Sequence, residues 1–202
     1  MPGNAVRAAI AAAFVMTSLL AVGERAAAQT LNDLTQTCAA CHGEAGVPTE
    51  KTTPVIWGQP RAYLLNQLND FKIGRRKNEI MSGVAESLSK QDMEALATYY
   101  SQQQWPDLQQ PAPSPEDRAA ADAVVNSLNC RGCHQANYQG DTVRPRLAGQ
   151  QDEYLLKTMT DFHTGERRNY IGMVVLMKSL DEAQLKPVAN YLASLRYNGR
   201  PK

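Results

Sequence analysis

The chain has little of several features that mark other classes of protein. Lysine and arginine together number 21, aspartate and glutamate number 20, only 6% of the residues are aromatic, and no basic stripe carries interleaved aromatic residues. This balance argues against nucleic acid as a partner. No segment shows the alternation of apolar and polar residues typical of β-strands, so the expected fold class is all-α. After residue 28, no apolar run reaches membrane-spanning length, so the mature chain is expected to be soluble.

The apolar run at the N-terminus has the form of a secretory signal. Arg7 supplies a positive start, residues 8–22 are apolar, and alanines 26–28 offer a small-residue cleavage site before Gln29. Cleavage there would leave about 174 of the 202 residues (202 minus 28), enough for two small domains. An uncleaved membrane anchor is the alternative. The sequence therefore predicts residues 1–28 as a signal peptide and the periplasm as the location.

All four cysteines lie in two copies of one short motif. The copies are residues 38–42, Cys-Ala-Ala-Cys-His, and residues 130–134, Cys-Arg-Gly-Cys-His. C-x-x-C-H attaches c-type haem: the thiols add across the porphyrin vinyl groups, and the histidine beside them binds the iron. Because this attachment takes place outside the bacterial cytoplasm, it agrees with an exported chain. We expect two covalent haem c groups, bound by Cys38, Cys41 and His42 and by Cys130, Cys133 and His134.

Three other interpretations of the motif are possible. A thioredoxin-like C-x-x-C requires a βαβ context, and neither copy has one. A zinc site built from two cysteines and a histidine needs a fourth ligand or an open position. One disulfide within each motif is also conceivable in an oxidising compartment. Two copies in similar surroundings favour haem over these alternatives.

The similarity of the two copies extends well beyond the cysteines, so the chain is a tandem repeat. The residues that recur 91 positions apart are Pro54, Gly58, Gln59, Tyr63, Leu64, Phe71, Gly74 and Asn78, matched by Pro145, Gly149, Gln150, Tyr154, Leu155, Phe162, Gly165 and Asn169. The offset is 92 at the cysteine motifs and again at Met81 and Met173, which implies a one-residue insertion just before the second methionine. A repeat of this length indicates duplicated domains. We predict one domain over residues 29–104 and another over 116–202.

Helical signals recur in both halves. The expected helices cover Tyr63–Ile73, its counterpart Tyr154–His163, and a segment from Ser89 to about Tyr100. Ser114 followed by a proline starts a helix that leads to the second cysteine motif, after a Gln/Pro-rich linker over residues 105–115. Residues 181–184 open the last helix, and Pro187 within it should kink it or delay its start.

The iron ligands are constrained by how few histidines there are. The chain has three, so two haems with two histidines each are impossible without a partner chain. His42 and His134 are the expected proximal ligands. The spare histidine, His163, aligns with Lys72 and is interpreted as a surface or helix-end residue.

Methionine is the expected sixth ligand, because a thioether suits low-spin haem iron. Met81 and Met173 are the pair that recurs in the repeat. Met177 lies one helical turn beyond Met173 and stays open as an alternative ligand for the second haem. Met93 and Met159 lie on helical faces, where methionine usually fills the core.

Residues around the ligands also have predicted roles. Pro54 and Pro145 follow the ligand histidines by 12 and 11 residues, a suitable place for the carbonyl that accepts the other ring N–H. They could instead serve only to form turns. The basic segments 75–77 and 167–168 precede the methionines and either pair with haem propionates, guide an acidic partner, or are solvated loop charges.

The sequence resembles the cytochrome c4 family, dihaem proteins built from two class I cytochrome c domains. The resemblance rests on the two C-x-x-C-H motifs, Met81 and Met173, and a P-x-x-x-G-Q-x-x-x-Y-L pattern at residues 54–64 and 145–155. It implies mostly helical domains with the haem propionates facing a shared interface. Family members carry electrons in the periplasm, often membrane-associated, toward terminal oxidases. Pro60, where the second copy has Gln151, is a departure from the repeat.

These observations support three functional hypotheses. The first is an electron carrier between a donor, such as a dehydrogenase or a cytochrome bc1-type complex, and an acceptor such as a terminal oxidase. The second is a permanent cytochrome subunit of a periplasmic oxidoreductase, because the chain is also similar to the dihaem subunit of flavocytochrome c sulfide dehydrogenases. The third, a dihaem peroxidase, would require an open iron position, and no catalytic group beyond the haem motifs is visible. The sequence therefore predicts an electron-transfer protein rather than an enzyme, and leaves peripheral membrane association open.

Overall fold

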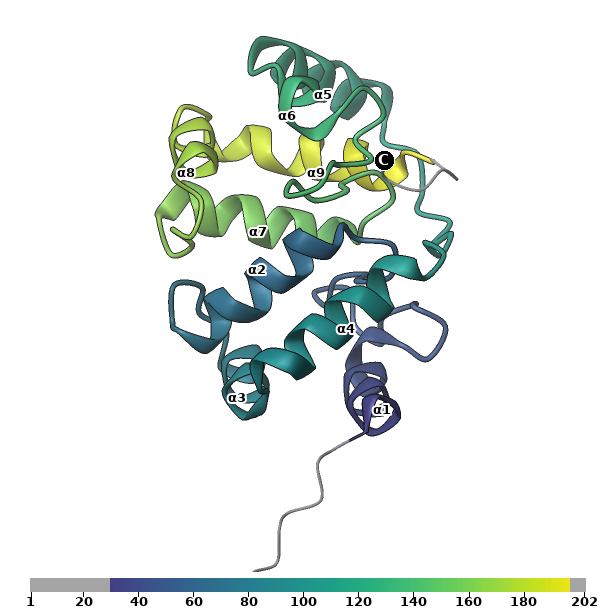
Figure 1. Ribbon diagram of the computed structural model, residues 1–202. Coiled ribbons are helices and arrows are strands. Elements are labelled where there is room, and N and C mark those ends of the chain that lie inside the picture. Colours follow the sequence, from purple (N-terminus) through teal and green to yellow (C-terminus); the bar gives the residue numbers. More distant parts are fainter. Residues whose placement is uncertain (1–29, 197–202) are drawn as a thin grey trace, which may run out of the picture.

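The computed structural model describes residues 30–196, and the predicted signal peptide lies outside them. All regular structure within this range is helical, as expected (Figure 1). The first half contains α1 (Leu31–His42), α2 (Arg61–Lys72), α3 (Glu79–Ser87) and α4 (Lys90–Gln102). The second half contains α5 (Pro115–Ser127), α6 (Cys130–His134), α7 (Asp152–Thr164), α8 (Ile171–Lys178), the 3-10 turn η1 (Glu182–Gln184) and α9 (Leu185–Ser194).

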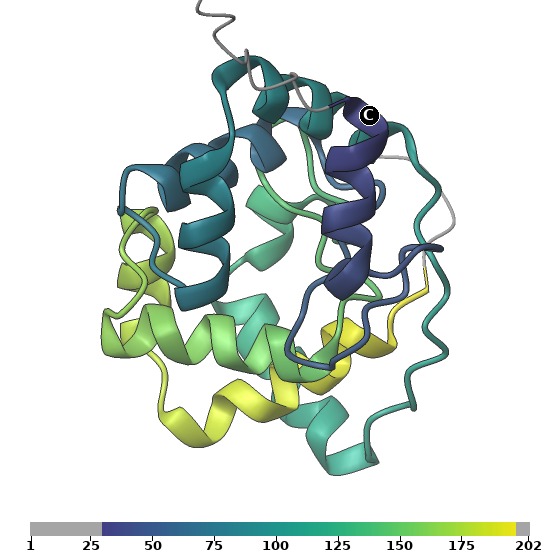
Figure 2. The same ribbon diagram turned by 90° about the horizontal axis from the view of Figure 1, so that it is seen from below.

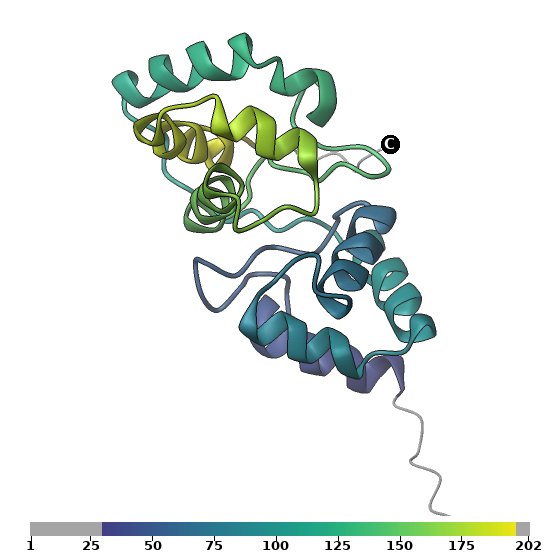
Figure 3. The ribbon, with the colours of Figure 1, turned by 90° about the vertical axis from the view of Figure 1, so that its left-hand side faces the viewer.

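The two halves form separate bodies, each with its own core (Figure 3). In the first, α4 packs on α1 and α2; in the second, α9 packs on α5 and α7. The apolar faces of these helices supply the cores. Leu64, Met93 and Leu96 are buried in the first core, and Leu155, Met159 and Leu192 in the second. The repeat in the sequence is thus a repeat in space.

Side-chain caps fix the start of several helices. Thr30 and Ser89 form capping boxes with the aspartates three residues later, and Ser114 caps α5 ahead of a proline at its first position. In the last helix, residues 182–184 form the 3-10 turn before α9 begins at Leu185, with Pro187 in its first turn. Proline is tolerated there because first-turn N–H groups have no partner within the helix. The predicted delay of this helix is confirmed.

The segment that joins the halves is extended and lies along one side of the molecule (Figure 2). It is attached to the second half. Arg146 stacks over the Trp105 ring at 4.3 Å, Gln110 donates to the side chain of Gln151 at 3.1 Å, and Arg196 pairs with Asp107 at 2.9 Å. The Gln/Pro-rich segment is therefore a packed strap rather than a free tether. Within residues 30–196, no helix is both long and apolar enough to cross a membrane.

Candidate haem sites

Each Cys-x-x-Cys-His motif ends a helical segment. Residues 38–42 form the last turns of α1, whereas residues 130–134 form the short helix α6, which is separated from α5 by Asn129 in the left-handed conformation (φ 48°). The first cysteine of each motif is partly buried and the second is exposed, and all four thiols are unpaired. Burial raises the pKa of Cys38 and of Cys130. The two motifs thus present their thiols in the same way.

The histidine of each motif is buried and oriented by a backbone carbonyl. Nδ1 of His42 lies 2.8 Å from the carbonyl oxygen of Pro54, and Nδ1 of His134 lies 3.0 Å from that of Pro145, as predicted. Since a carbonyl only accepts, Nδ1 carries the proton and Nε2 keeps its lone pair. Burial lowers the pKa of both histidines, which favours the neutral form that binds iron. Orientation and protonation therefore both suit a haem ligand.

Met81 and Met173 occupy the same place in their helices, the third residue of α3 and of α8. The inserted residue between the copies is accommodated just before α8. In the first half Asn78 caps α3 by accepting from the Met81 N–H at 2.9 Å. In the second half Tyr170 takes the cap position without a side-chain cap bond, and its neighbour Asn169 instead donates to Asp70 of the first half at 2.8 Å. The insertion shifts the cap but leaves the methionine in register.

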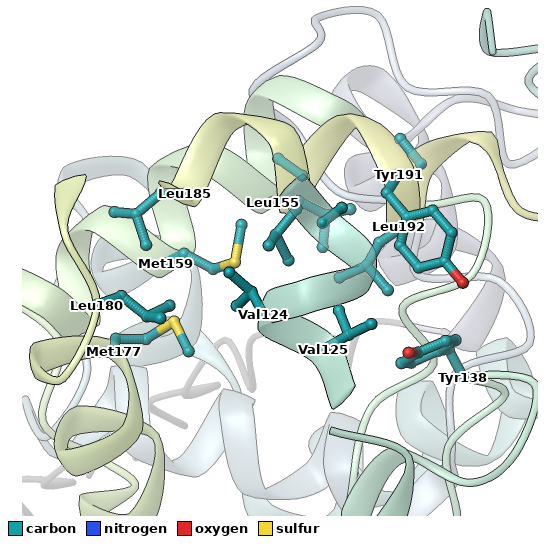
Figure 4. Close-up of a cluster of buried hydrophobic side chains, with 14 of the residues drawn as sticks. Val124, Val125, Tyr138, Leu155, Met159, Met177, Leu180, Leu185, Tyr191 and Leu192 are labelled. Carbon is teal, nitrogen blue, oxygen red and sulfur yellow. The ribbon is translucent and has the colours of Figure 1, made fainter. Parts of the chain in front are cut away.

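The other methionines belong to the cores. Met177 packs beside Leu180 (Figure 4), and Met159 also lies in this cluster. Met93 is buried in the first core. Met173, by contrast, is only partly buried and packs against the edge of the cluster. Met177 is thus used by the core, which favours Met173 as the ligand for the second haem.

His163 has a role that its alignment with Lys72 explains. It stands in the last turn of α7, partly buried, with Nδ1 2.8 Å from the carbonyl oxygen of Met177 at the end of α8. Lys72 donates to the carbonyl oxygens of Glu86 at 2.8 Å and of Leu88 at 2.5 Å, at and just beyond the end of α3. Both side chains therefore bond the C-terminal carbonyls of the methionine-bearing helix. This agrees with a helix-end histidine rather than an iron ligand.

The basic segments before the methionines divide into buried and exposed residues. Arg76 donates to the Tyr154 hydroxyl of the other half at 3.0 Å, and Arg167 donates to Gln67 at 2.8 Å. Each guanidinium also stacks on a phenylalanine of its own half. Arg167 is only 7% exposed because the interface between the halves covers it, so two of its three interpretations, a guide for a partner and a solvated loop charge, are wrong. Arg75, Lys77 and Arg168 are exposed and keep those possibilities.

The same interface contains two residues whose role the sequence did not reveal. Gln59 and Gln150 are buried and each reaches the main chain of the opposite half. Gly58 and Gly149, in the left-handed region at φ 66° and 74°, turn the chain just before them. The recurrence of Gly-Gln in both copies was visible as a pattern. The main-chain groups that the two glutamines bind, 87 and 95 positions away, could not be identified from the sequence.

The side chains present fit haem better than the alternatives. The cysteines form no disulfide, and within residues 30–196 no three His, Cys, Asp or Glu side chains gather as a cluster for a bare metal ion. Each half instead offers two thiols, a buried neutral imidazole and a methionine on a separate helix. Haem iron, when held by such a set, supplies one-electron chemistry, and the protein sets its ligands and surroundings.

Comparison with known proteins identifies the family. The cytochrome c family model matches residues 26–104 and 119–196. Cytochrome c4 of Azotobacter vinelandii is 32% identical over 180 residues, 78% of this chain and 84% of that protein. The thiosulfate dehydrogenase electron acceptor of Thiomonas intermedia is 33% identical over 170 residues, 78% of this chain and 77% of that protein.

A solved structure shows the same architecture. Reduced cytochrome c4 from Pseudomonas stutzeri matches with a TM-score of 0.73 at 28% identity, covering 84% of this chain and all of that one. The two matched domains and the cysteine motifs indicate two covalently bound haem c groups. The chain therefore belongs to the cytochrome c family, as a dihaem electron-transfer protein of the cytochrome c4 type.

Proposed function

We propose that each half is a His/Met haem domain. Residues 29–104 would hold the first haem through Cys38, Cys41, His42 and Met81, and residues 116–202 the second through Cys130, Cys133, His134 and Met173, with residues 105–115 as the linker. The observation that carries this proposal is the register of the methionines, each the third residue of its helix despite the insertion. Six-coordinate iron suits electron transfer, because neither haem then has an open position for a substrate.

The proposed role is to carry electrons in the periplasm between a donor oxidoreductase and a downstream acceptor such as a terminal oxidase. Similarity to a thiosulfate dehydrogenase electron acceptor supports a periplasmic dehydrogenase as the class of donor. The predicted signal peptide, residues 1–28, supports the location. Two haems in one chain would allow one domain to face the donor while the other faces the acceptor.

A second candidate is a permanent cytochrome subunit of such an oxidoreductase. It is favoured by exposed apolar side chains on α8, next to the proposed ligand Met173. Ile171 and Val175 are 71% and 63% exposed, and Tyr170 beside them is also exposed. In the first half, Ile80 next to Met81 is 67% exposed. An exposed apolar group of this kind marks a protein contact, and a permanent partner would keep it covered from water.

An optical redox titration of the purified holoprotein, with and without carbon monoxide, tests the ligation. Two low-spin haems that do not bind carbon monoxide would support His/Met ligation of both. Ready binding by one reduced haem would show an open sixth position, and the peroxidase hypothesis would have to be reconsidered. Purification from the native source then separates the two roles, since a permanent subunit co-elutes with its dehydrogenase and a carrier does not.

A further inference from the structure

The peptide group that orients each ligand histidine is itself held by the opposite half of the molecule. In the first half this is the peptide between Pro54 and Val55. Its carbonyl oxygen accepts from Nδ1 of His42 at 2.8 Å, and its N–H donates to Oε1 of Gln150 at 2.8 Å. One peptide plane therefore connects the histidine of one half to a glutamine of the other.

The second half repeats this arrangement in reverse. The Pro145 carbonyl accepts from His134 at 3.0 Å, and the N–H of Arg146 donates to Oε1 of Gln59 at 2.9 Å. A second bond completes each contact: the side-chain amide of Gln150 donates to the Val55 carbonyl at 2.9 Å, and that of Gln59 to the Arg146 carbonyl at 3.0 Å. Each glutamine thus binds both main-chain groups of one residue, as a neighbouring β-strand would.

These bonds are shielded from water. Gln59 is 4% exposed and Gln150 1%, and the residues that they bind are equally buried. When one partner is removed, water does not readily replace the lost bond in such a site. The hydrogen bonds of the two glutamines to the main chain therefore depend on the packing of one half against the other.

The chain of hydrogen bonds has an electrostatic consequence. A peptide whose N–H is bonded becomes more polarised, and its carbonyl becomes a stronger acceptor. A stronger acceptor on Nδ1 makes the imidazole a more basic ligand, which stabilises oxidised iron and lowers the reduction potential. Loss of the glutamine should weaken the carbonyl and raise the potential.

We propose that Gln150 and Gln59 are crossed positioning residues, each of which sets the reduction potential of the haem in the opposite half. Gln150 acts on the haem of the first half through the Pro54–Val55 peptide. Gln59 acts on the haem of the second half through the Pro145–Arg146 peptide. This inference rests on the proposed assignment of His42 and His134 as ligands.

The test uses the holoprotein with Gln150→Ala or Gln59→Ala. The potential of each haem is followed separately through its NMR-resolved methyl resonances during a redox titration. We expect Gln150→Ala to raise the reduction potential of the haem in the first half and to leave that of the second haem unchanged. The expected change is about threefold in the equilibrium constant for reduction, or roughly 28 mV, since a tenfold change in a one-electron couple is 59 mV. Gln59→Ala should give the opposite pattern. Gln150→Leu and Gln59→Leu, which keep the side-chain volume, provide variants if an alanine variant misfolds.

Hydrogen exchange supplies an independent measurement. Gln150→Ala should speed exchange of the Val55 amide and Gln59→Ala that of the Arg146 amide. Gln67→Ala is the matched control, because Gln67 is also an interface amide but bonds arginine and asparagine side chains rather than either peptide. It should not produce the crossed pattern.

The outcomes separate this inference from the ligand assignment. Suppose that a variant keeps its His/Met spectra and shows the expected faster amide exchange. The role of the glutamines would then be overturned if the reduction potentials of both haems shift equally, if only the haem in the same half as the substituted glutamine shifts, or if neither shifts. Wild-type spectra without histidine ligation would instead overturn the assignment on which it rests.

Discussion

Methionine shows how residues of one type are divided between chemistry and packing. Met81 and Met173 recur at the third position of equivalent helices, whereas Met177 aligns with Ala85 and fills the core. A thioether is soft and flexible enough for either task. We infer that the position of a methionine relative to the helix start decides which task it performs.

Substitution should separate these two tasks. Met173→Ala is expected to open the second haem to carbon monoxide and to lower its potential, because Met/His ligation raises the potential. Met177→Ala should leave carbon monoxide binding unchanged and cost about 2–5 kcal/mol of unfolding free energy, as large-to-small core changes do. Optical spectra with carbon monoxide and denaturant titrations measure both effects. Carbon monoxide binding by the Met177 variant alone would reverse the assignment.

Single residues differ in how well the sequence alone predicts them. The histidines, their proline carbonyls and the pairing of Met81 with Met173 follow from short motifs and the repeat. Gln59 and Gln150 recur just as regularly, yet their partners are main-chain atoms of the other half. Only the packing of the two halves reveals such contacts, because no side-chain type identifies a backbone partner.

At the scale of helices, α3 and α8 differ at their first turn. The Asn78 side chain accepts from the Met81 N–H, whereas Tyr170 leaves the equivalent groups of α8 without a side-chain partner. The Met173 N–H donates instead to the Tyr170 carbonyl oxygen at 3.1 Å, a 3-10-type bond that tightens the start of the helix. Here that turn contains the proposed ligand Met173.

Restoring the cap should stabilise the second half. We expect Tyr170→Asn to add about 1 kcal/mol to its unfolding free energy, since asparagine is a favoured cap and Tyr170 is exposed. Asn78→Ala is the matched control and should cost about the same amount in the first half. Guanidinium unfolding of the holoproteins measures both. A loss of stability in the Tyr170 variant would show that its ring contributes more than the missing cap.

The sequence predicted some helices better than others. Apolar periodicity located α2 and α7, and the capping serines 89 and 114 located the starts of α4 and α5. The short helices α3 and α8 were not predicted, because they are too short for a clear periodicity and each contains a glycine. The break between α5 and α6 was also missed, since it depends on the left-handed conformation of Asn129.

At the scale of the whole molecule, the halves meet across a partly buried group of charges and phenols. Arg76 and Arg167 lie close to Tyr63 and Tyr154, the pair that recurs in the repeat. Burial acts to raise the pKa of Tyr154, but the charges of Arg76 and Arg167 outweigh it and lower the pKa to about 7. Burial dominates for Tyr63 and raises its pKa. Equivalent tyrosines are thus made different by their positions.

This difference predicts a pH dependence. The pKa of Tyr154 in the folded protein lies below its unfolded value of about 10. Its ionisation therefore stabilises the folded state fully above a pH of about 10, and this stabilisation is lost as pH falls through about 7. The unfolding free energy from this group should therefore rise between these pH values. Arg76→Gln should raise the Tyr154 pKa and flatten the rise. NMR titration of ¹³C-labelled tyrosine, with Tyr154→Phe to assign the signal, measures the shift; an unmoved pKa in the Arg76 variant would refute it.

The exposed basic residues predict a second property of the whole molecule. Arg75→Glu combined with Arg168→Glu should slow reduction by an acidic partner by about tenfold at low salt, and the difference should vanish at high salt. Lys51→Glu combined with Lys90→Glu is the matched control, because it reverses the same number of charges at side chains that are 70% and 80% exposed and that lie outside the basic segments 75–77 and 167–168. Stopped-flow reduction at several ionic strengths measures the rates. Equal slowing by the control would indicate a net-charge effect only.

The crossed glutamine contacts also bear on how the chain originated. The two halves use equivalent residues in a reciprocal contact, which is the isologous form of a twofold homodimer. Because the glutamines bind main-chain atoms, the contact tolerates Val55 in one half and Arg146 in the other. We infer that a single-domain ancestor could pair with its own copy through this surface. Fusion of the two genes would then have held each domain at a high effective concentration near the other. With the pairing maintained in this way, the side chains around each haem could diverge.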